Sequence, residues 1–369
     1  MKGMGAVRNI VAAPTEGSLN PVLRERWLRA IETWMNTLEE HHGLEEPYLE
    51  FLSAGIESLQ GEDAEVLLPS LCELETDPDP CRVGTALSGV GTPGSWTFSP
   101  LPSTTAHFGP YRLELRDSIQ IRHDGGAVRV TSGAQPSEGW TFHRPAGAWM
   151  RSNGTPSRTF QLADRSVPIL RQGDLTLSME PSEKNEPPRY PPEEVVRTFE
   201  EAAALMAAAS PEYTAWVAHV LRAVEVVETD GTKVESGSNP SKPGSISFTY
   251  PLRADHLATL LVHEAAHQYL HQYHAALPVV DVNDTRRYFS PFRRTERPLY
   301  GILLAFHAAV NILVFIDRAL PLCEDSGFLT DERKELRQAI DQMLPPMRDA
   351  PGLTATGREI VQDLRSLVE

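Results

Sequence analysis

The residues best suited to chemistry in this 369-residue sequence are two histidines four positions apart, with a glutamate directly after the first. They are His263, Glu264 and His267, in the stretch LLVHEAAHQYL. On a helix, residues i and i+4 share one face, so both imidazoles can reach one metal ion. Apolar residues recur at helical spacing around them, Asp255 can act as N-cap, and Pro278 would end the helix. The pattern predicts a metal site on a helix, and the alternative is a pair of structural histidines.

A catalytic metal needs a third protein ligand and an open coordination position. His307 lies in an otherwise apolar helical run, where a buried imidazole needs a partner such as a metal held by a neighbouring helix. Glu296 is the carboxylate that a zinc peptidase would use, because two histidines and a downstream glutamate form a common zinc set. His271 and His274 continue the helical stripe and are expected to support or border the site. His307 and Glu296 both remain open as the third ligand, and a carbonyl-bonded core histidine is the alternative at position 307.

Composition indicates a soluble globular protein, since 41% of the residues are hydrophobic and 23% are charged. The 34 basic and 50 acidic side chains give a net charge of −16, which disfavours nucleic acid or an anionic membrane as the main partner and suits a basic or neutral peptide better. The three cysteines show no CxxC spacing, so no disulfide framework or zinc knuckle is predicted. The N-terminus lacks the uninterrupted apolar segment of a signal peptide. The apolar run 302–316 is expected to be too short to span a bilayer. We expect a cytoplasmic protein.

The order of predicted elements indicates an α+β fold in three parts. A helical N-terminal segment is expected over 1–75, with helices at 21–40, 48–60 and 64–74. A linker and a small antiparallel β-rich region are expected over 76–180, with the Pro- and Gly-rich linker at 76–105 and strands at 111–115, 118–122, 127–131, 140–143, 158–162, 167–170 and 175–179. Neither βαβ units nor a glycine-rich phosphate loop is predicted.

A mostly helical, metal-binding catalytic domain is expected over 193–369, and not a cupin barrel. Its helices are predicted at 193–209, 211–226, around the HExxH motif, and at 297–318, 330–343 and 356–368. A mobile loop is predicted over 234–245 and a polar irregular segment over 281–296. An edge strand is predicted at 247–250, where it could present its backbone to an extended peptide.

Two segments and the apolar helix that follows them resemble a known enzyme family. The segments are LLVHEAAHQYL at 260–270, preceded by the strand-like SISFTYPL, and RRYFSPFRRTERPLYG at 286–301. The combination resembles the HExxH-motif proteins found beside ribosomal peptide natural-product genes, which are iron(II)/α-ketoglutarate-dependent peptide β-hydroxylases. The resemblance covers roughly residues 193–318, and the second segment carries most of its specificity. It implies iron(II), α-ketoglutarate and O2 as cofactors and a ribosomally made precursor peptide as substrate.

The resemblance also implies a cation for the distal carboxylate of α-ketoglutarate. Arginine suits that role because its planar fork binds a carboxylate bidentately in a largely dry pocket. Arg297 is the first choice, and Arg293 or Arg294 is the second; solvated surface arginines are the alternative. A zinc peptidase has less use for several arginines ahead of the next helix.

The implied metal ligands are His263, His267 and His307. This set would be all-histidine, whereas common oxygenase triads contain two histidines and one carboxylate. In an oxygenase Glu264 would orient a ligand or approach the metal. In a zinc metallopeptidase the same glutamate would be the general base that activates metal-bound water, with Glu296 as third ligand. A third interpretation is a non-catalytic helical binding protein whose HExxH motif is structural.

Overall fold

The computed structural model describes nearly all residues from 193 to the C-terminus. Before residue 193 it describes only individual strands between residues 94 and 178. The described residues are 94–98, 104–108, 111–115, 119–123, 127–132, 139–143, 150–151, 158–171, 176–178, 193–228, 236–240, 244–323 and 327–369. The three helices expected before residue 75 lie outside them. Helices and several small sheets are both present, as expected for an α+β fold.

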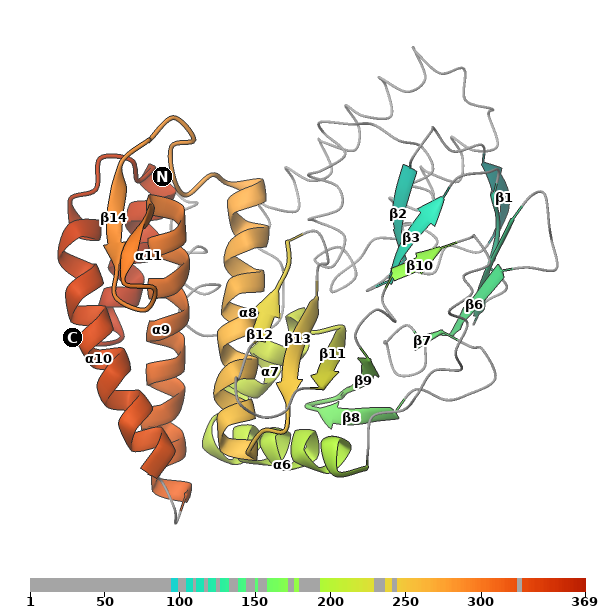
Figure 1. Ribbon diagram of the computed structural model, residues 1–369, viewed down its shortest axis with the longest axis horizontal. Coiled ribbons are helices and arrows are strands. Elements are labelled where there is room, and N and C mark those ends of the chain that lie inside the picture. Colours follow the sequence, from blue (N-terminus) through green and yellow to red (C-terminus); the bar gives the residue numbers. More distant parts are fainter. Residues whose placement is uncertain are drawn as a thin grey trace.

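Two small sheets lie in the first part of the chain (Figure 1). One has the order β1-β4-β5-β6-β7, with every pair antiparallel, and consists of β1 (Gly94–Phe98), β4 (Ile119–His123), β5 (Ala127–Ser132), β6 (Gly139–His143) and β7 (Met150–Arg151). The other has the order β10-β3-β2, in which β10 is parallel to β3, and consists of β2 (Thr104–Phe108), β3 (Tyr111–Leu115) and β10 (Thr176–Ser178).

These sheets confirm the predicted strands of the β-rich region, where Ile121, Val128, Val130 and Phe142 are fully buried on alternating positions. The linker expected over 76–105 is wrong in part, because β1 lies within it and β2 begins in it. Each of these strands is only five residues long and is flanked by proline or glycine. Because these residues are typical of turns, the sequence predicted a linker instead of strands.

A third, five-stranded sheet contains both parallel and antiparallel pairs. Its order is β12-β13-β11-β9-β8, from β8 (Arg158–Leu162), β9 (Arg165–Arg171), β11 (Ala223–Glu228), β12 (Ser236–Ser238) and β13 (Ser245–Tyr250). The central strand β11 is parallel to both β9 and β13. The chain crosses from β9 to β11 through α6 (Glu193–Ala209) and α7 (Pro211–Val220). A helical crossover between parallel strands therefore exists, which corrects the expectation that there would be none.

Three predicted elements of this sheet need correction. The helix expected over 211–226 ends at Val220, and the following Val224 and Val226 lie in a strand that is buried between two parallel neighbours. The predicted mobile loop contains β12, which pairs antiparallel with β13. Consequently β13 is not an edge strand, and β12 forms that edge of the sheet.

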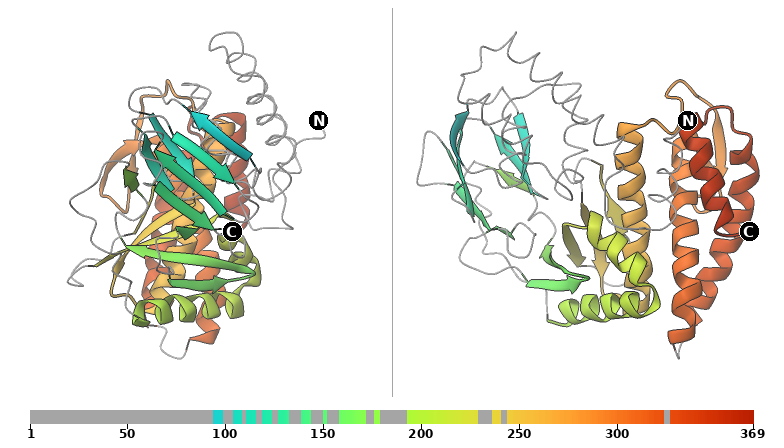
Figure 2. Two further views of the ribbon diagram at one scale, coloured as in Figure 1. Left: turned by 90° about the vertical axis from the view of Figure 1, so that its right-hand side faces the viewer. Right: turned by 180° about the vertical axis from the view of Figure 1, so that it is seen from behind.

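Four helices pack beside this sheet: α8 (Ala254–Ala276), α9 (Leu299–Ala319), α10 (Gly327–Arg348) and α11 (Ala355–Ser366), with the 3-10 turn η2 (Leu320–Leu322) after α9. Figure 1 shows α8 between the mixed sheet and α9, and the right-hand view of Figure 2, from behind, shows the same order. The HExxH helix is confirmed. Its N-cap is Arg253 and not Asp255, whose carboxylate instead accepts hydrogen bonds from Arg253 and from the His256 N–H.

The helix α9 is the apolar core of this layer. The span Leu299–Leu322 is long and apolar enough to cross a membrane, which corrects the expectation that its apolar run is too short. However, 78% of its most hydrophobic window is buried inside the protein. Its buried Asn311 is fully bonded, because its amide donates to the His307 carbonyl at 2.8 Å and its Oδ1 accepts from the Tyr213 hydroxyl at 2.9 Å. These contacts identify α9 as a core helix of the fold.

A β-hairpin connects α8 to α9. It consists of β14 (Arg287–Ser290) and β15 (Thr295–Pro298), paired antiparallel, and it replaces most of the irregular segment expected over 281–296. The sequences RYFS and TERP carry no apolar alternation, so pairing and packing against α9, not a local pattern, define these strands.

Candidate metal centre

The two histidines of the HExxH motif point at each other from successive turns of α8. Their Nε2 atoms are 2.8 Å apart, and their rings are nearly perpendicular, at 86°. Two nitrogen ligands at about 2.1 Å from one metal lie about 3.0 Å apart when they are at right angles and about 3.4 Å apart in a tetrahedral set, whereas 2.8 Å is also an ordinary hydrogen-bond distance between two imidazoles. The spacing of His263 and His267 is therefore close to that of two adjoining ligands of one metal ion, and it also fits a hydrogen bond between the two rings.

Both imidazoles are held in their neutral form. Burial lowers the pKa of His263, and the nearby Arg293 guanidinium lowers it further against the opposing effect of Glu264. Burial also lowers the pKa of His267 well below its usual value, with contributions from neighbouring histidines and from Arg297. Neutral imidazoles present lone pairs, as metal ligation requires. The His263 side chain is 35% exposed, so the pair is open to solvent on one side.

Glu264 is buried beside this pair, with 2% of its side chain exposed. Its Oε1 lies 3.9 Å from the Nε2 of His263 and accepts a hydrogen bond from the Ser236 hydroxyl on β12. Its Oε2 is buried and has no hydrogen-bond partner among the described residues. A buried acceptor without a partner is uncommon, so this oxygen is suited to a ligand or water in the site. The sequence did not indicate Ser236, because β12 looked like a loop.

Gln268 fixes the position of the sheet against α8. It is 1% exposed, its Oε1 accepts from the Gly244 N–H at 3.1 Å, and its amide donates to the Ser245 carbonyl at 3.3 Å. Both groups stand at the start of β13, which in turn pairs with β12. The residue after the second motif histidine therefore aligns the strand that carries Ser236.

The structure does not place a third metal ligand directly beside the histidine pair. His307 is 1% exposed on α9 and lies near enough to His267 to lower its pKa. No group of three or more His, Cys, Asp or Glu side chains in the described part of the chain is close enough to hold a metal. Glu296 is exposed and occupies the face of β15 opposite to Arg297, as strand alternation requires. Two of the three predicted ligands therefore meet, and His307 approaches them from a second helix.

Of the three candidate arginines, Arg297 alone is partly buried. Its guanidinium lies over Gly301, where a β-carbon would come within 3.2 Å of Nε and 3.3 Å of Cζ. Within the described part of the chain no carboxylate pairs with it. Tyr288, its cross-strand partner, has a buried hydroxyl without a hydrogen-bond partner among the same residues. An unpaired guanidinium near the neutral imidazole of His267 is an attractive environment for a carboxylate ligand.

The other two arginines occupy the exposed turn of the hairpin. Arg294 has the left-handed backbone conformation, with φ of 52°, and its N–H bonds the Ser290 carbonyl at 2.7 Å. Arg293 is also exposed, and its N–H bonds the Ser290 hydroxyl at 3.4 Å. Solvent screens both side chains, which makes them weaker candidates than Arg297 for a dry carboxylate pocket.

The remaining histidines of α8 are bonded within the protein. The Nδ1 of His271 lies 2.7 Å from the Tyr300 hydroxyl, and the Nδ1 of His274 accepts from the Val279 N–H at 3.1 Å. Burial lowers the pKa of His271 to about 4. These contacts show how both side chains are held, and their position beside or outside the shell of metal ligands stays a prediction.

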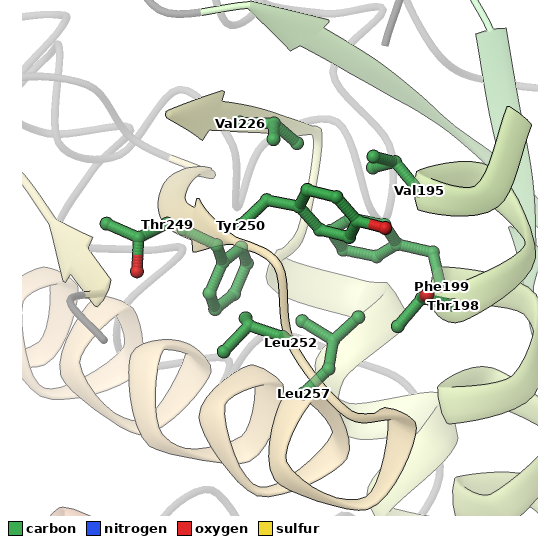
Figure 3. A pocket seen from close by; sticks show the side chains of 9 residues that line it. Val195, Thr198, Phe199, Val226, Thr249, Tyr250, Leu252 and Leu257 are labelled. Atoms are coloured by element: carbon green, nitrogen blue, oxygen red, sulfur yellow. The ribbon is translucent and has the colours of Figure 1, made fainter. Parts of the chain in front are cut away.

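A small apolar cavity lies near the N-terminal half of α8 (Figure 3). It is lined by side chains of α6, β11, β13 and the first turns of α8, namely Val195, Thr198, Phe199, Val226, Phe248, Thr249, Tyr250, Leu252 and Leu257. Its volume of about 10 Å³ is barely sufficient for one water molecule. It therefore cannot hold a keto acid.

Comparison with models of protein families finds no match for this chain, and neither does comparison with curated proteins. The function must therefore be inferred from the residues of the site.

Proposed function

We propose that this protein is an iron(II)/α-ketoglutarate-dependent oxygenase that hydroxylates side chains of a peptide. The observation that supports this most directly is the position of Arg297. In a chain of net charge −16, this partly buried guanidinium has no acidic partner among the described residues, and it is near enough to His267 to lower the pKa of that imidazole. A carboxylate co-substrate bound between them would neutralise that charge.

His263 and His267 would hold the metal, and His307 is the candidate third ligand. When bound, iron with its keto acid supplies the oxidation, in which O2 converts α-ketoglutarate to succinate and CO2 while a substrate C–H becomes C–OH. Arg297 would bind the distal carboxylate of the keto acid through its two parallel N–H groups. Glu264, held by Ser236, would accept a hydrogen bond from a group in the site. The buried side of the histidine pair excludes water, and the exposed side of His263 admits the peptide.

The decisive experiment is an anaerobic titration of the metal-free protein with iron(II) and then α-ketoglutarate, followed by visible absorption. We expect a charge-transfer band only when both are present, lost in His263→Ala and shifted to higher keto acid concentration in Arg297→Ala. Thermal unfolding of each variant would show that the fold is retained. Tight retention of zinc without any band would contradict the proposal.

The position of Glu264 favours a second candidate, a zinc metallopeptidase. A carboxylate 3.9 Å from a ligand nitrogen, anchored by a serine, is well placed to take a proton from metal-bound water. In that case Glu264→Gln would abolish peptide cleavage while metal remains bound, and Arg297→Ala would have little effect. Cleavage of peptides by the zinc-loaded protein, with no consumption of keto acid by the iron-loaded protein, would select this candidate.

A further inference from the structure

The outer side of the β14–β15 hairpin and its turn form a surface that the proposed chemistry does not use. In a two-stranded ribbon, directly paired residues share a face. Phe289 pairs with Glu296, Arg287 pairs with Pro298, and all four residues are exposed. The turn adds Phe292, Arg293 and Arg294. We call Arg287, Phe289, Phe292, Arg293 and Arg294 the hairpin surface.

The hairpin is basic in an otherwise acidic chain. Residues 286–297 contain five arginines and one glutamate, a local charge of +4, whereas the whole chain carries −16. Arg286 is paired with Asp284 at 2.6 Å. Arg293 and Arg294 have no carboxylate partner within 4 Å in the part of the chain that the structure describes. Both turn arginines are therefore available to an external anion.

The same surface exposes aromatic rings. Phe289 is 53% exposed and Phe292 is 48% exposed. Together with Val282 just before the hairpin, they make up three of the four large hydrophobic side chains that the described residues expose. Arginine and aromatic side chains are the types that most often dominate binding energy at protein interfaces.

The hairpin is connected to the candidate metal centre through α9. Both of its strands pack against α9, and α9 packs along α8, the helix that carries the histidine pair. Both motif histidines are partly exposed, and the side chain of His263 is 35% exposed. A peptide docked on the hairpin surface would therefore extend toward the exposed side of the histidine pair.

We propose that the hairpin surface docks an acidic, apolar segment of the peptide substrate beside the residue to be modified. This rests on the proposed function in one respect, because it takes the substrate to be a peptide. It reverses the preference for a basic or neutral peptide that the net charge alone suggested, because contacts at short range depend on the local +4 and not on the total. An anionic membrane would fit the same side chains, but the total charge of −16 would repel its extended surface.

The test is fluorescence anisotropy with a short fluorescein-labelled peptide in which Glu and Asp alternate with Leu and Phe. The same peptide with Lys in place of every acidic residue is the probe control. The purified full-length chain is used without iron or keto acid. We expect the acidic peptide to bind at least about tenfold more tightly than the Lys peptide, and more weakly as salt rises from about 0.05 to about 0.3 M.

Two double variants and a matched control assign the binding to the surface. Arg293→Glu with Arg294→Glu should weaken acidic-peptide binding by about tenfold or more, and Phe289→Ala with Phe292→Ala by about fivefold or more. Arg197→Glu with Arg348→Glu makes the same charge change at exposed arginines on α6 and α10 and should leave binding nearly unchanged. Unchanged unfolding temperatures would show that the variants fold.

Each outcome decides the proposal. Failure to bind the acidic peptide, equal binding of the Lys peptide, or equal loss in the control variant would overturn it. Binding of phosphatidylserine vesicles that depends on Arg293 and Arg294, with no peptide binding, would assign the surface to membranes. Acidic-peptide binding that depends on the hairpin, in a protein without the iron and keto acid band, would retain the docking surface and remove only the oxygenase.

Discussion

The four histidines His263, His267, His271 and His274 form a stripe along one face of α8, and the two halves of this stripe differ. In the first half, His263 and His267 turn their Nε2 atoms toward each other at 2.8 Å. In the second half, His271 and His274 turn away to a tyrosine hydroxyl and a backbone N–H. The difference indicates that a histidine stripe is not in itself a metal site. The candidate metal centre is where the ring nitrogens converge on one another.

The segment 297–300 repeats this contrast. Arg297 lies close enough to His267 to lower its pKa, and it has no acidic partner in the described part of the chain. Three residues later, Tyr300 bonds His271 and packs its ring against His274, with the ring centroids 4.3 Å apart and the planes tilted by 31°. The histidines of the first half of the stripe are therefore able to bind a ligand. Those of the second half are held by contacts within the protein, and we call this half the locked half.

Removing one ring from each half should give the largest difference. His267→Ala should lower iron(II) affinity by at least about a hundredfold, because a metal that loses one of few protein ligands is held weakly. His274→Ala should leave the affinity within about threefold, because its nitrogen is occupied by the Val279 N–H. Competition with a metal indicator dye measures both. Equal losses would show that the two halves do not differ.

The next effect concerns the co-substrate. Arg297→Ala should raise the α-ketoglutarate concentration for half-saturation by about ten- to a hundredfold, the worth of one or two charge-assisted hydrogen bonds. Gly301→Ala should give a smaller rise, since its β-carbon would displace the guanidinium without removing its charge. Arg287→Ala, on the outer face, is the control. An unchanged half-saturation in Arg297→Ala would place the co-substrate elsewhere.

The pH dependence of stability should report the locked half. Burial lowers the pKa of His271 from 6.5 to about 4. Between these two pH values the unfolded chain binds a proton at this residue and the folded chain does not. The free energy of unfolding should therefore fall from pH 6.5 toward pH 4, by at most about 1.4 kcal/mol per pH unit for this residue. His271→Gln can keep a bond to Tyr300 without titrating and should flatten the slope. Urea unfolding at several pH values measures it.

The smallest effect should come from Tyr300→Phe. It removes the hydroxyl that bonds His271 but keeps the ring against His274, so it should cost about 1 kcal/mol of stability. Iron(II) affinity should not change measurably, because neither Tyr300 nor His271 is a proposed ligand of the metal. Urea unfolding and the dye competition measure the two quantities together. A loss of metal affinity with no loss of stability would reverse the assignment of the halves.

Stretches with a clear periodic pattern, either helical or alternating, were predicted well, whereas short strands without such a pattern were not. The helix Glu193–Ala209 and the HExxH helix were predicted because apolar residues recur every three or four positions over several turns. Ala223–Glu228 was predicted as helix because it follows one without a break, and only its two parallel neighbours make it a strand. The β14–β15 hairpin was missed because TERP and RYFS have no pattern that favours pairing.

The site residues also fall into two groups, those identifiable from the sequence and those that only the structure identified. His263, His267 and Glu264 could be identified from the sequence because their spacing alone places them on one helical face. Ser236 could not, since it depends on β12 pairing with β13 and on Gln268 aligning that strand with α8. The choice among the arginines also required the structure, because strand alternation directs Arg297 inward and leaves Arg293 and Arg294 in the turn.

The sequence by itself determined the motif, the helix that carries it and the local excess of arginine before α9, because each depends on residues close together in the chain. Tertiary structure decided which histidines converge, which arginine is shielded from solvent and which strand lies beside Glu264. These properties depend on contacts between α8, α9, the hairpin and the mixed sheet, whose partners are distant in sequence. Burial by these contacts lowers the pKa of His263 and His267.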